Sequence, residues 1–409
     1  MQQTLKDLFP PQNTFDIHHY FDWAATTPPD ADILRESLEL TLHAYGNPSS
    51  IHQAGSQARA LLEKAREACA HVLGVPQNQL YFTSGGTESD HIPLLSMLTR
   101  QNRTNMRILI SALEHPALRE QCAVLERAGV HIDTVLPDKN GFITPEAVTE
   151  KLTADTVYVS VMAVNNETGC IQPIYKIADA LSQATAGKRR PHFHVDCVQA
   201  AGKIPLALAH TGIDSAAFSA HKLCGPRGIG LLYLAKPLTP FLTGGGQEQN
   251  IRSGTENLFG AISFARCLER YWIALEETAD ENGARNRFAQ QTVWTDEFVQ
   301  RIAAMDGAAL VPAARLTDSG RFSPWVVQAA FKNIPGNVMV RALDAKGFAI
   351  STGSACSAKK QSRPILAAMQ ISRDMQDTAV RFSFGTHTTQ DDMQALLQAV
   401  QDISRTFSR

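Results

Sequence analysis

The 409-residue sequence lacks the marks of several protein classes. No run of about eighteen apolar residues occurs, and residues 1–10 have neither the basic nor the apolar region of a signal peptide. The formal net charge is only −2, so the overall balance offers no basic surface for nucleic acid or for an acidic membrane. We therefore expect a cytoplasmic protein that has no membrane partner and no direct nucleic-acid contact.

Cysteine is present but is not arranged as a metal site or as a disulfide framework. The seven cysteines show neither a CxxC motif nor Cys/His spacing, which argues against zinc and predicts no metal site. An odd number of cysteines also argues against a framework of disulfides. The sequence thus favours a reducing compartment.

Predicted strands and helices alternate through the first 240 residues. Short apolar runs predict strands at 80–83, 107–111, 131–136, 156–163, 192–195, 215–218 and 228–234. Helical spacing of apolar residues occurs at 31–44, 58–72, 117–128 and 174–186. This order predicts an α/β fold with an open, mostly parallel sheet flanked by helices, whose ligands bind beyond the carboxyl ends of the strands.

The pattern changes after residue 255. Residues 260–305 resemble one or two long, charged helices, and a sparser mixture of strands and helices follows from residue 323. We expect two domains, a large one at 20–265 and a smaller α+β one made of 1–19 and 266–409.

A lysine at a predicted strand end is the first candidate for chemistry. Lys222 follows the predicted strand at 215–218 and precedes a glycine-rich stretch. A lysine amine in a dry site has a lowered pKa and forms Schiff bases with aldehyde cofactors. Taken alone, a lysine at such a place is more often a surface residue of a loop.

A glycine turn at residues 84–87 is a candidate anion site. Ser84, Gly85, Gly86 and Thr87 follow a predicted strand and open a predicted helix. Backbone N–H groups, hydroxyls and the helix dipole converge on an anion at such a place. A turn of this kind is, by itself, more often structural.

Three further polar residues follow predicted strands. Asp196 ends an apolar run, and a buried carboxylate needs a partner, which a protonated pyridine nitrogen would supply. Its other interpretations are a helix N-cap or a structural ion pair. Asn166 offers amide donors to a ring oxygen or stands in a turn, and His115 either stacks on a flat ring or is a packed turn residue.

One cysteine has a setting unlike the other six. Cys356 lies among small residues, with Lys359, Lys360 and Arg363 close behind it. Nearby cations favour the thiolate, which is the nucleophilic form. Cys69 falls at a core-facing helix position, and we expect it to be inert.

Together these segments resemble the cysteine desulfurases, within the class V aminotransferase superfamily of pyridoxal-phosphate enzymes of fold type I. The resemblance covers roughly residues 20–390. Its motifs are DWAATTP at 22–28, GNPSS at 46–50, TSGGTESD at 83–90, EH at 114–115, VNNETG at 164–169, HVDCVQ at 194–199, SAHK at 219–222, RSGT at 252–255, STGSAC at 351–356 and VRFSFG at 380–385.

The resemblance implies a role for each matching residue. Lys222 would bond the aldehyde of pyridoxal 5'-phosphate, Asp196 would pair with the pyridine nitrogen, and His115 would stack on the ring and take part in proton transfers. The remaining implied contacts are the ring hydroxyl for Asn166 and Gln199, the phosphate for Gly86, Thr87, Ser219, His221 and, from the second subunit of a homodimer, Thr255, and the substrate for Asn47 and Arg381, whose guanidinium would grip the carboxylate.

The implied reaction converts L-cysteine to L-alanine and leaves a persulfide on Cys356 for a sulfur-acceptor protein. The segment after Cys356, which is rich in basic residues, resembles the long loop found in one branch of the cysteine desulfurases. That branch supplies sulfur for iron-sulfur cluster assembly and tRNA thiolation. Alternatives are a selenocysteine lyase, another class V aminotransferase, or a non-catalytic scaffold.

Overall fold

The structure is a computed structural model that describes residues 15–99, 105–210, 212–275, 283–353 and 363–407. Its larger sheet has seven strands in the order β1-β7-β6-β5-β4-β2-β3. The strands are β1 (Leu80–Thr83), β2 (Arg107–Ser111), β3 (His131–Val135), β4 (Thr156–Ser160), β5 (His192–Asp196), β6 (Ser215–Ser219) and β7 (Gly230–Leu234). Only β7 runs antiparallel to its neighbours, so the predicted mostly parallel sheet is confirmed.

The strand predicted at 156–163 is shorter in the structure. β4 ends at Ser160, although the amide of Ala163 still donates to the carbonyl of Asp196 at 2.9 Å. Residues 161–164 are apolar and buried, although they lie beyond the end of the strand. The apolar run in the sequence is therefore longer than the strand.

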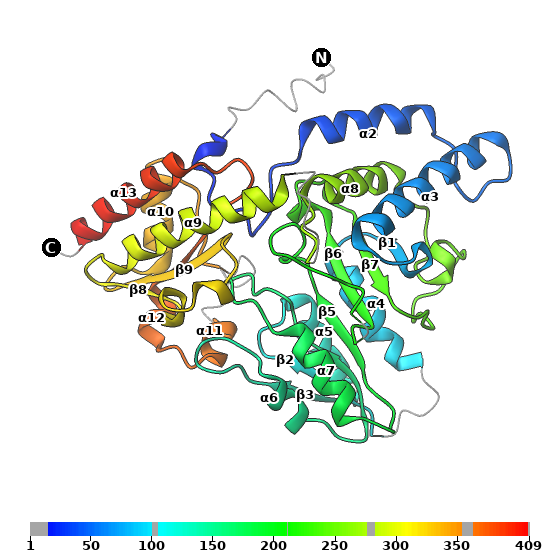
Figure 1. The fold of residues 1–409 in the computed structure, drawn as a ribbon, viewed down its shortest axis with the longest axis horizontal. Coiled ribbons are helices and arrows are strands. Elements are labelled where there is room, and N and C mark those ends of the chain that lie inside the picture. Colours follow the sequence, from blue (N-terminus) through cyan, green and yellow to red (C-terminus); the bar gives the residue numbers. More distant parts are fainter. Residues whose placement is uncertain (1–14, 100–104, 211, 276–282, 354–362, 408–409) are drawn as a thin grey trace, which may run out of the picture.

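Helices cover both faces of this sheet (Figure 1). The helices in the part of the sequence that contains this sheet are α2 (Ala31–His43), α3 (Gln53–Leu73), α4 (Gly86–Ser96), α5 (Pro116–Arg127), α6 (Pro145–Glu150), α7 (Ile174–Ala184) and α8 (Leu258–Tyr271). Successive strand residues point to opposite faces. Leu109 and Val159 therefore join the core with α3, α7 and α8, whereas Ile108 and Tyr158 pack with α4 and α5.

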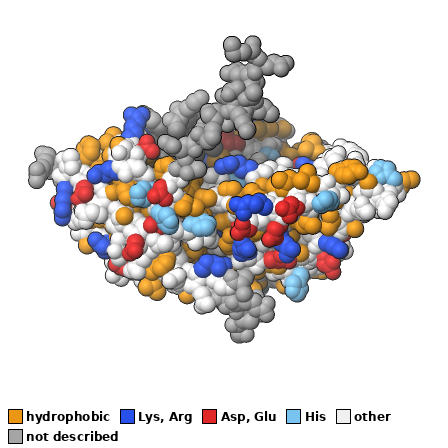
Figure 2. Space-filling view, turned by 90° about the horizontal axis from the view of Figure 1, so that it is seen from above, with side chains coloured by type: hydrophobic (Ala, Val, Ile, Leu, Met, Phe, Trp, Pro, Cys, Tyr) orange, Lys and Arg blue, Asp and Glu red, His pale blue; other side chains and the backbone are white. Residues whose placement is uncertain are grey.

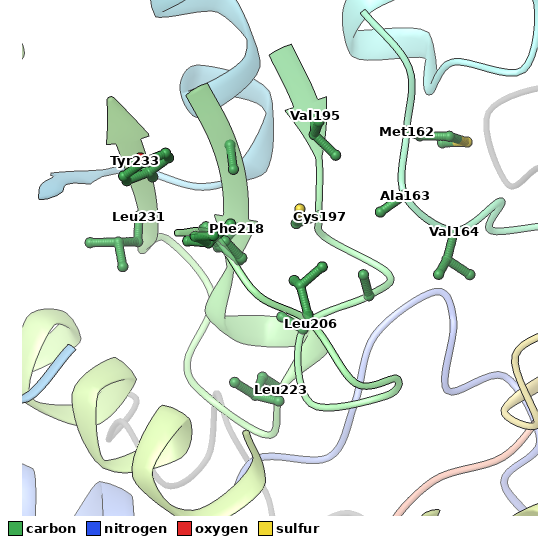
Figure 3. Packing of buried hydrophobic residues seen from close by; sticks show 14 of the residues in the cluster. Met162, Ala163, Val164, Val195, Cys197, Leu206, Phe218, Leu223, Leu231 and Tyr233 are labelled. Atoms are coloured by element: carbon green, nitrogen blue, oxygen red, sulfur yellow. The ribbon is translucent and has the colours of Figure 1, made fainter. Parts of the chain in front are cut away.

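The core on the first face extends to the carboxyl ends of the strands. Val195 from β5, Phe218 from β6 and Leu231 from β7 lie beside Cys197 and Leu223 (Figure 3). The turns that follow β5 and β6 are thus fixed by packing, which holds the polar side chains of these turns in place.

A second, three-stranded antiparallel sheet forms the other part of the molecule. It contains β8 (Ala308–Leu310), β9 (Val326–Phe331) and β10 (Ala379–Ser383), in the order β10-β9-β8. Its helices are α9 (Ala284–Ala303), α10 (Gly336–Asp344), α11 (Pro364–Ala368), α12 (Arg373–Thr378) and α13 (Gln390–Phe407). The chain near the N-terminus joins this part, because Tyr20 pairs with Ala349 and Asp22 pairs with Ser383.

The predicted charged segment at 260–305 is two helices of different character. α8 is largely buried and packs on α2 and α3, so the expectation of a charged helix is wrong for α8. α8 also spans residue 265, and the domain division there stays a prediction. Among the described residues, no helix has both the length and the apolar character needed to cross a bilayer.

Candidate active site

A cavity of about 270 Å³ lies where β4, β5 and β6 end and α4 begins. This volume is near the lower limit of small-molecule sites, which is about 300 Å³. The described lining residues are Ala24, Gly86, Thr87, Asp90, His115, Met162, Val164, Asn166, Asp196, Val198, Gln199, Ser219, His221 and Lys222. The structure therefore brings most of the predicted site residues together at the predicted end of the sheet.

One end of the cavity suits an anion. The N-cap of α4 is Gly85, and within the described part of the chain no side chain caps the start of the helix. A Cβ added at Gly86 would lie 2.7 Å from Cγ2 of Val198, so a glycine is needed for this close approach. Ser219 and His221 line the same cavity. Free helix amides beside hydroxyl and imidazole groups fit a phosphate.

Lys222 supplies a reactive amine. Its Nζ donates to the carbonyl of Ala24 at 2.8 Å and to that of Ala25 at 2.6 Å. Burial, assisted by the charge of Arg381, lowers the Lys222 pKa to about 8. About a tenth of this amine is thus neutral, and therefore nucleophilic, near pH 7, which is far more than for an ordinary lysine.

Asp196 is the last residue of β5 and is 5% exposed. One carboxylate oxygen accepts from the amide of Val198 at 2.8 Å. Burial, with a smaller effect of Asp90, raises the Asp196 pKa to about 7. A cation such as a protonated pyridine nitrogen would stabilise the charged carboxylate here.

Sequence reasoning gave no role to the acidic groups beneath Asp196. Asp90, 1% exposed, lines the cavity and lies 3.1 Å from Nε2 of His194. Burial raises the pKa values of Asp90 and Glu114 well above their usual range, and it lowers the His194 pKa to about 4. Burial therefore disfavours the charged forms of all three groups.

His115 and Asn166 reach the cavity from different strand ends. Nδ1 of His115 accepts from the amide of Ala117 at 3.2 Å, so the imidazole caps α5 as well as lining the cavity. Burial and the charge of Lys222 lower its pKa to about 4, which keeps the ring neutral. Oδ1 of Asn166 is buried and has no partner among the described residues.

Arg381 lies on β10 of the smaller sheet, just behind Asn166. One amino group of its guanidinium donates to the carbonyls of Asn166 and Gly353, at 2.9 and 3.0 Å. The other bonds the Asp22 carboxylate at 2.7 Å, and Nε is buried without a described partner. Arg381 is not among the described residues that line the cavity, so its predicted contact with the substrate carboxylate stays a prediction.

Asn47 and Thr255 do not line the cavity of their own chain. Asn47 is exposed, and its side-chain oxygen accepts from the amide of Ser49 at 2.9 Å. Thr255 is exposed as well. Their predicted roles stay predictions, and so does that of Cys356, which lies outside the described residues. The other six cysteines are buried and free, and burial raises the Cys69 pKa to about 12, which agrees with an inert thiol.

The chain is similar to a well-defined group of proteins. Residues 19–396 match the family model described as aminotransferase class-V. A cysteine desulfurase IscS of Dictyoglomus turgidum is 31% identical, over 94% of both chains, and cysteine desulfurase 2 of Trichormus variabilis is 34% identical over 94% of this chain and 92% of that protein. A solved NifS-like protein has a TM-score of 0.84 and 31% identity, over 95% of this chain and 99% of its own.

Proposed function

The chain belongs to the class-V aminotransferase family and is a pyridoxal-phosphate-dependent cysteine desulfurase, and from this premise we propose how its own residues carry out the reaction. The observation that carries the proposal is the cavity in which Lys222, Asp196 and the uncapped start of α4 meet. An amine, a buried carboxylate and an anion site are the three groups that the aldehyde, the pyridine nitrogen and the phosphate require.

With the cofactor bound, Lys222 would bond its aldehyde and Asp196 would pair with its ring nitrogen. Gly86, Thr87, Ser219 and His221 would hold the phosphate, and Asn166 and Gln199 would bond the ring hydroxyl. His115 would stack on the ring and exchange protons. When bound, the cofactor withdraws electrons from the substrate and so acidifies its Cα–H bond.

The protein residues bind the substrate and move protons. Arg381 binds the carboxylate of L-cysteine, and Asn47 assists. The Lys222 amine would take the Cα proton and, after the C–S bond has broken, a proton returns to Cα. The Cys356 thiolate then attacks the substrate sulfur, the C–S bond breaks, and its electron pair and a proton end on Cβ. The products are L-alanine and a Cys356 persulfide, so atoms and electrons balance.

Two partners complete the proposal. Thr255 is not among the described residues that line the cavity of the same chain. A second copy of the chain would supply its Thr255 to this cavity. A sulfur-acceptor protein collects the persulfide for iron-sulfur cluster assembly or tRNA thiolation. We place the protein in the cytoplasm, where a reducing environment suits its buried free thiols.

Mass spectrometry after incubation with L-cysteine tests the proposal. We expect the protein to gain one sulfur atom, and peptide mapping to locate it on Cys356. The six buried cysteines serve as internal controls in the same molecule. Cys356→Ala should abolish both this gain and the release of sulfide under reducing conditions. Unchanged sulfide release by Cys356→Ala would show that the persulfide mechanism is wrong.

A further inference from the structure

A second lysine is buried behind Lys222. Lys203 lies in the turn after β5 and is 7% exposed. Its backbone is fixed, since its amide donates to the carbonyl of Ala200 at 3.0 Å and its carbonyl accepts from Nε1 of Trp325 at 2.7 Å. No acidic side chain of the described chain forms an ion pair with it. A buried lysine without a carboxylate is costly, which points to a role beyond packing.

The Lys203 amine orients the Gln199 side chain. Its Nζ donates to Oε1 of Gln199 at 2.6 Å, while Nε2 of Gln199 donates to the carbonyl of Ala24 at 2.8 Å. An amide can rotate by half a turn, which would exchange its donor and acceptor ends. Because a lysine amine that donates to Oε1 stabilises only one orientation, the NH₂ group of Gln199 stays on the side of Ala24.

Gln199 and one carbonyl connect the two lysines. The Ala24 carbonyl that accepts from Gln199 also accepts from Nζ of Lys222, at 2.8 Å. Lys203 and Lys222 also line the same small cavity of about 30 Å³, which has room for one water. The cavity walls are largely apolar, including Trp23, Leu223, Trp325 and Phe384. Little therefore screens one amine from the other.

The other charged or titratable groups near Lys203 do not cancel its charge. Those that line the small cavity or interact electrostatically with Lys203 are Lys222, His221, Cys224, Tyr271 and Arg381. Two of these are cations and none is a carboxylate. Burial, followed by the charge of Lys222, lowers the Lys203 pKa to about 7.

We propose that Lys203 is a positioning residue for the cofactor, because its amine holds the Gln199 amide in one orientation. This inference rests on the proposed function, in which Gln199 bonds the ring hydroxyl of the cofactor. Lys203 itself touches neither substrate nor cofactor, so its effect is read from the bound cofactor.

The affinity of the protein for pyridoxal phosphate, measured from the visible band of the bound cofactor, tests this role. Lys203→Met removes the donor to Gln199 and should bind the cofactor several-fold more weakly. Lys203→Gln keeps a donor for Gln199, so its cofactor affinity should stay near wild type.

Two further variants complete the experiment. Lys203→Arg also keeps a donor and should bind the cofactor close to wild type, and Lys236→Met, at an exposed position, should not change the cofactor affinity. Equal cofactor affinities for wild type and Lys203→Met would overturn the proposal. A separate result would show that the proposed function is wrong. If Lys222 does not bond the cofactor aldehyde, Lys222→Ala will show the same visible band as wild type.

Discussion

At the scale of single residues, Arg381 illustrates how one side chain depends on distant parts of the chain. Its guanidinium is held by Asp22 and by two backbone carbonyls, which leaves Nε without a described partner. Asp22 is 359 positions away in sequence. This arrangement fixes the plane of the guanidinium, and a fixed plane favours bidentate binding of a carboxylate.

Replacing Arg381 by lysine should therefore weaken substrate binding. A lysine retains one positive charge but cannot form two parallel hydrogen bonds. We expect the KM for L-cysteine to rise at least about tenfold, which corresponds to about 1.4 kcal/mol. Steady-state kinetics measure this change, and the visible spectrum of the bound cofactor should stay unchanged as a control. An unaltered KM would remove Arg381 from substrate binding.

The residues that the sequence identified share one property. Asp196, Ser219 and Lys222 stand at or just after strand ends, and strand ends can be read from apolar runs. The missed residues, Asp90 and Lys203, act through contacts that the fold creates. Asp90 meets His194 from 104 positions away, and the link from Lys203 to Lys222 passes through a backbone carbonyl of Ala24.

At the scale of elements, an ion pair joins α3, β1 and the turn at residues 248–250. Arg66 of α3 forms two hydrogen bonds with the Glu248 carboxylate, at 2.6 and 2.8 Å, and also donates to the carbonyl of Leu80 at 3.0 Å. The amide of Phe82 donates to the same carboxylate at 2.7 Å. Arg66 and Glu248 are 2% and 5% exposed, so neither can be rehydrated without local unfolding.

Breaking this ion pair should destabilise the protein strongly. Arg66→Met would leave the Glu248 carboxylate buried without a cation, and we expect the free energy of unfolding to fall by about 3–5 kcal/mol. Denaturant unfolding followed by circular dichroism measures the loss. The matched double variant Arg66→Met with Glu248→Gln removes the uncompensated charge and should recover part of it. Equal stability of Arg66→Met and wild type would show that the pair is dispensable.

The elements themselves were predictable to different degrees. α3 has regular apolar spacing and ends at Gly74 in the left-handed conformation (φ 65°), so the pattern and the glycine marked it. The end of β4 was not predictable, because residues 161–164 are buried at the site for reasons of tertiary packing. Apolar character reports burial, and it indicates a strand only where a ladder is also formed.

At the scale of the whole molecule, one face carries unusually exposed apolar side chains. Leu38, Leu42, Tyr45 and Ile51, from α2 and the segment after it, are 51%, 66%, 84% and 98% exposed. Figure 2 views the molecule from the side on which α2 lies in Figure 1 and shows hydrophobic side chains interspersed with charged ones on this face. Patches of this kind are typical of protein interfaces. A second copy of the chain would cover them.

A charge on α2 should therefore separate the subunits and weaken cofactor binding together. We expect wild type to sediment as a dimer and Leu42→Glu to sediment as a monomer, because a carboxylate would be desolvated in an apolar interface. The monomer should bind pyridoxal phosphate more weakly, since Thr255 would no longer reach the phosphate from the second subunit. Val293→Glu is the matched control, since Val293 on α9 is 68% exposed, and it should stay dimeric.

A Leu42→Glu protein that remains a dimer would place the interface elsewhere, whereas a monomer with unchanged cofactor affinity would remove Thr255 from the phosphate site.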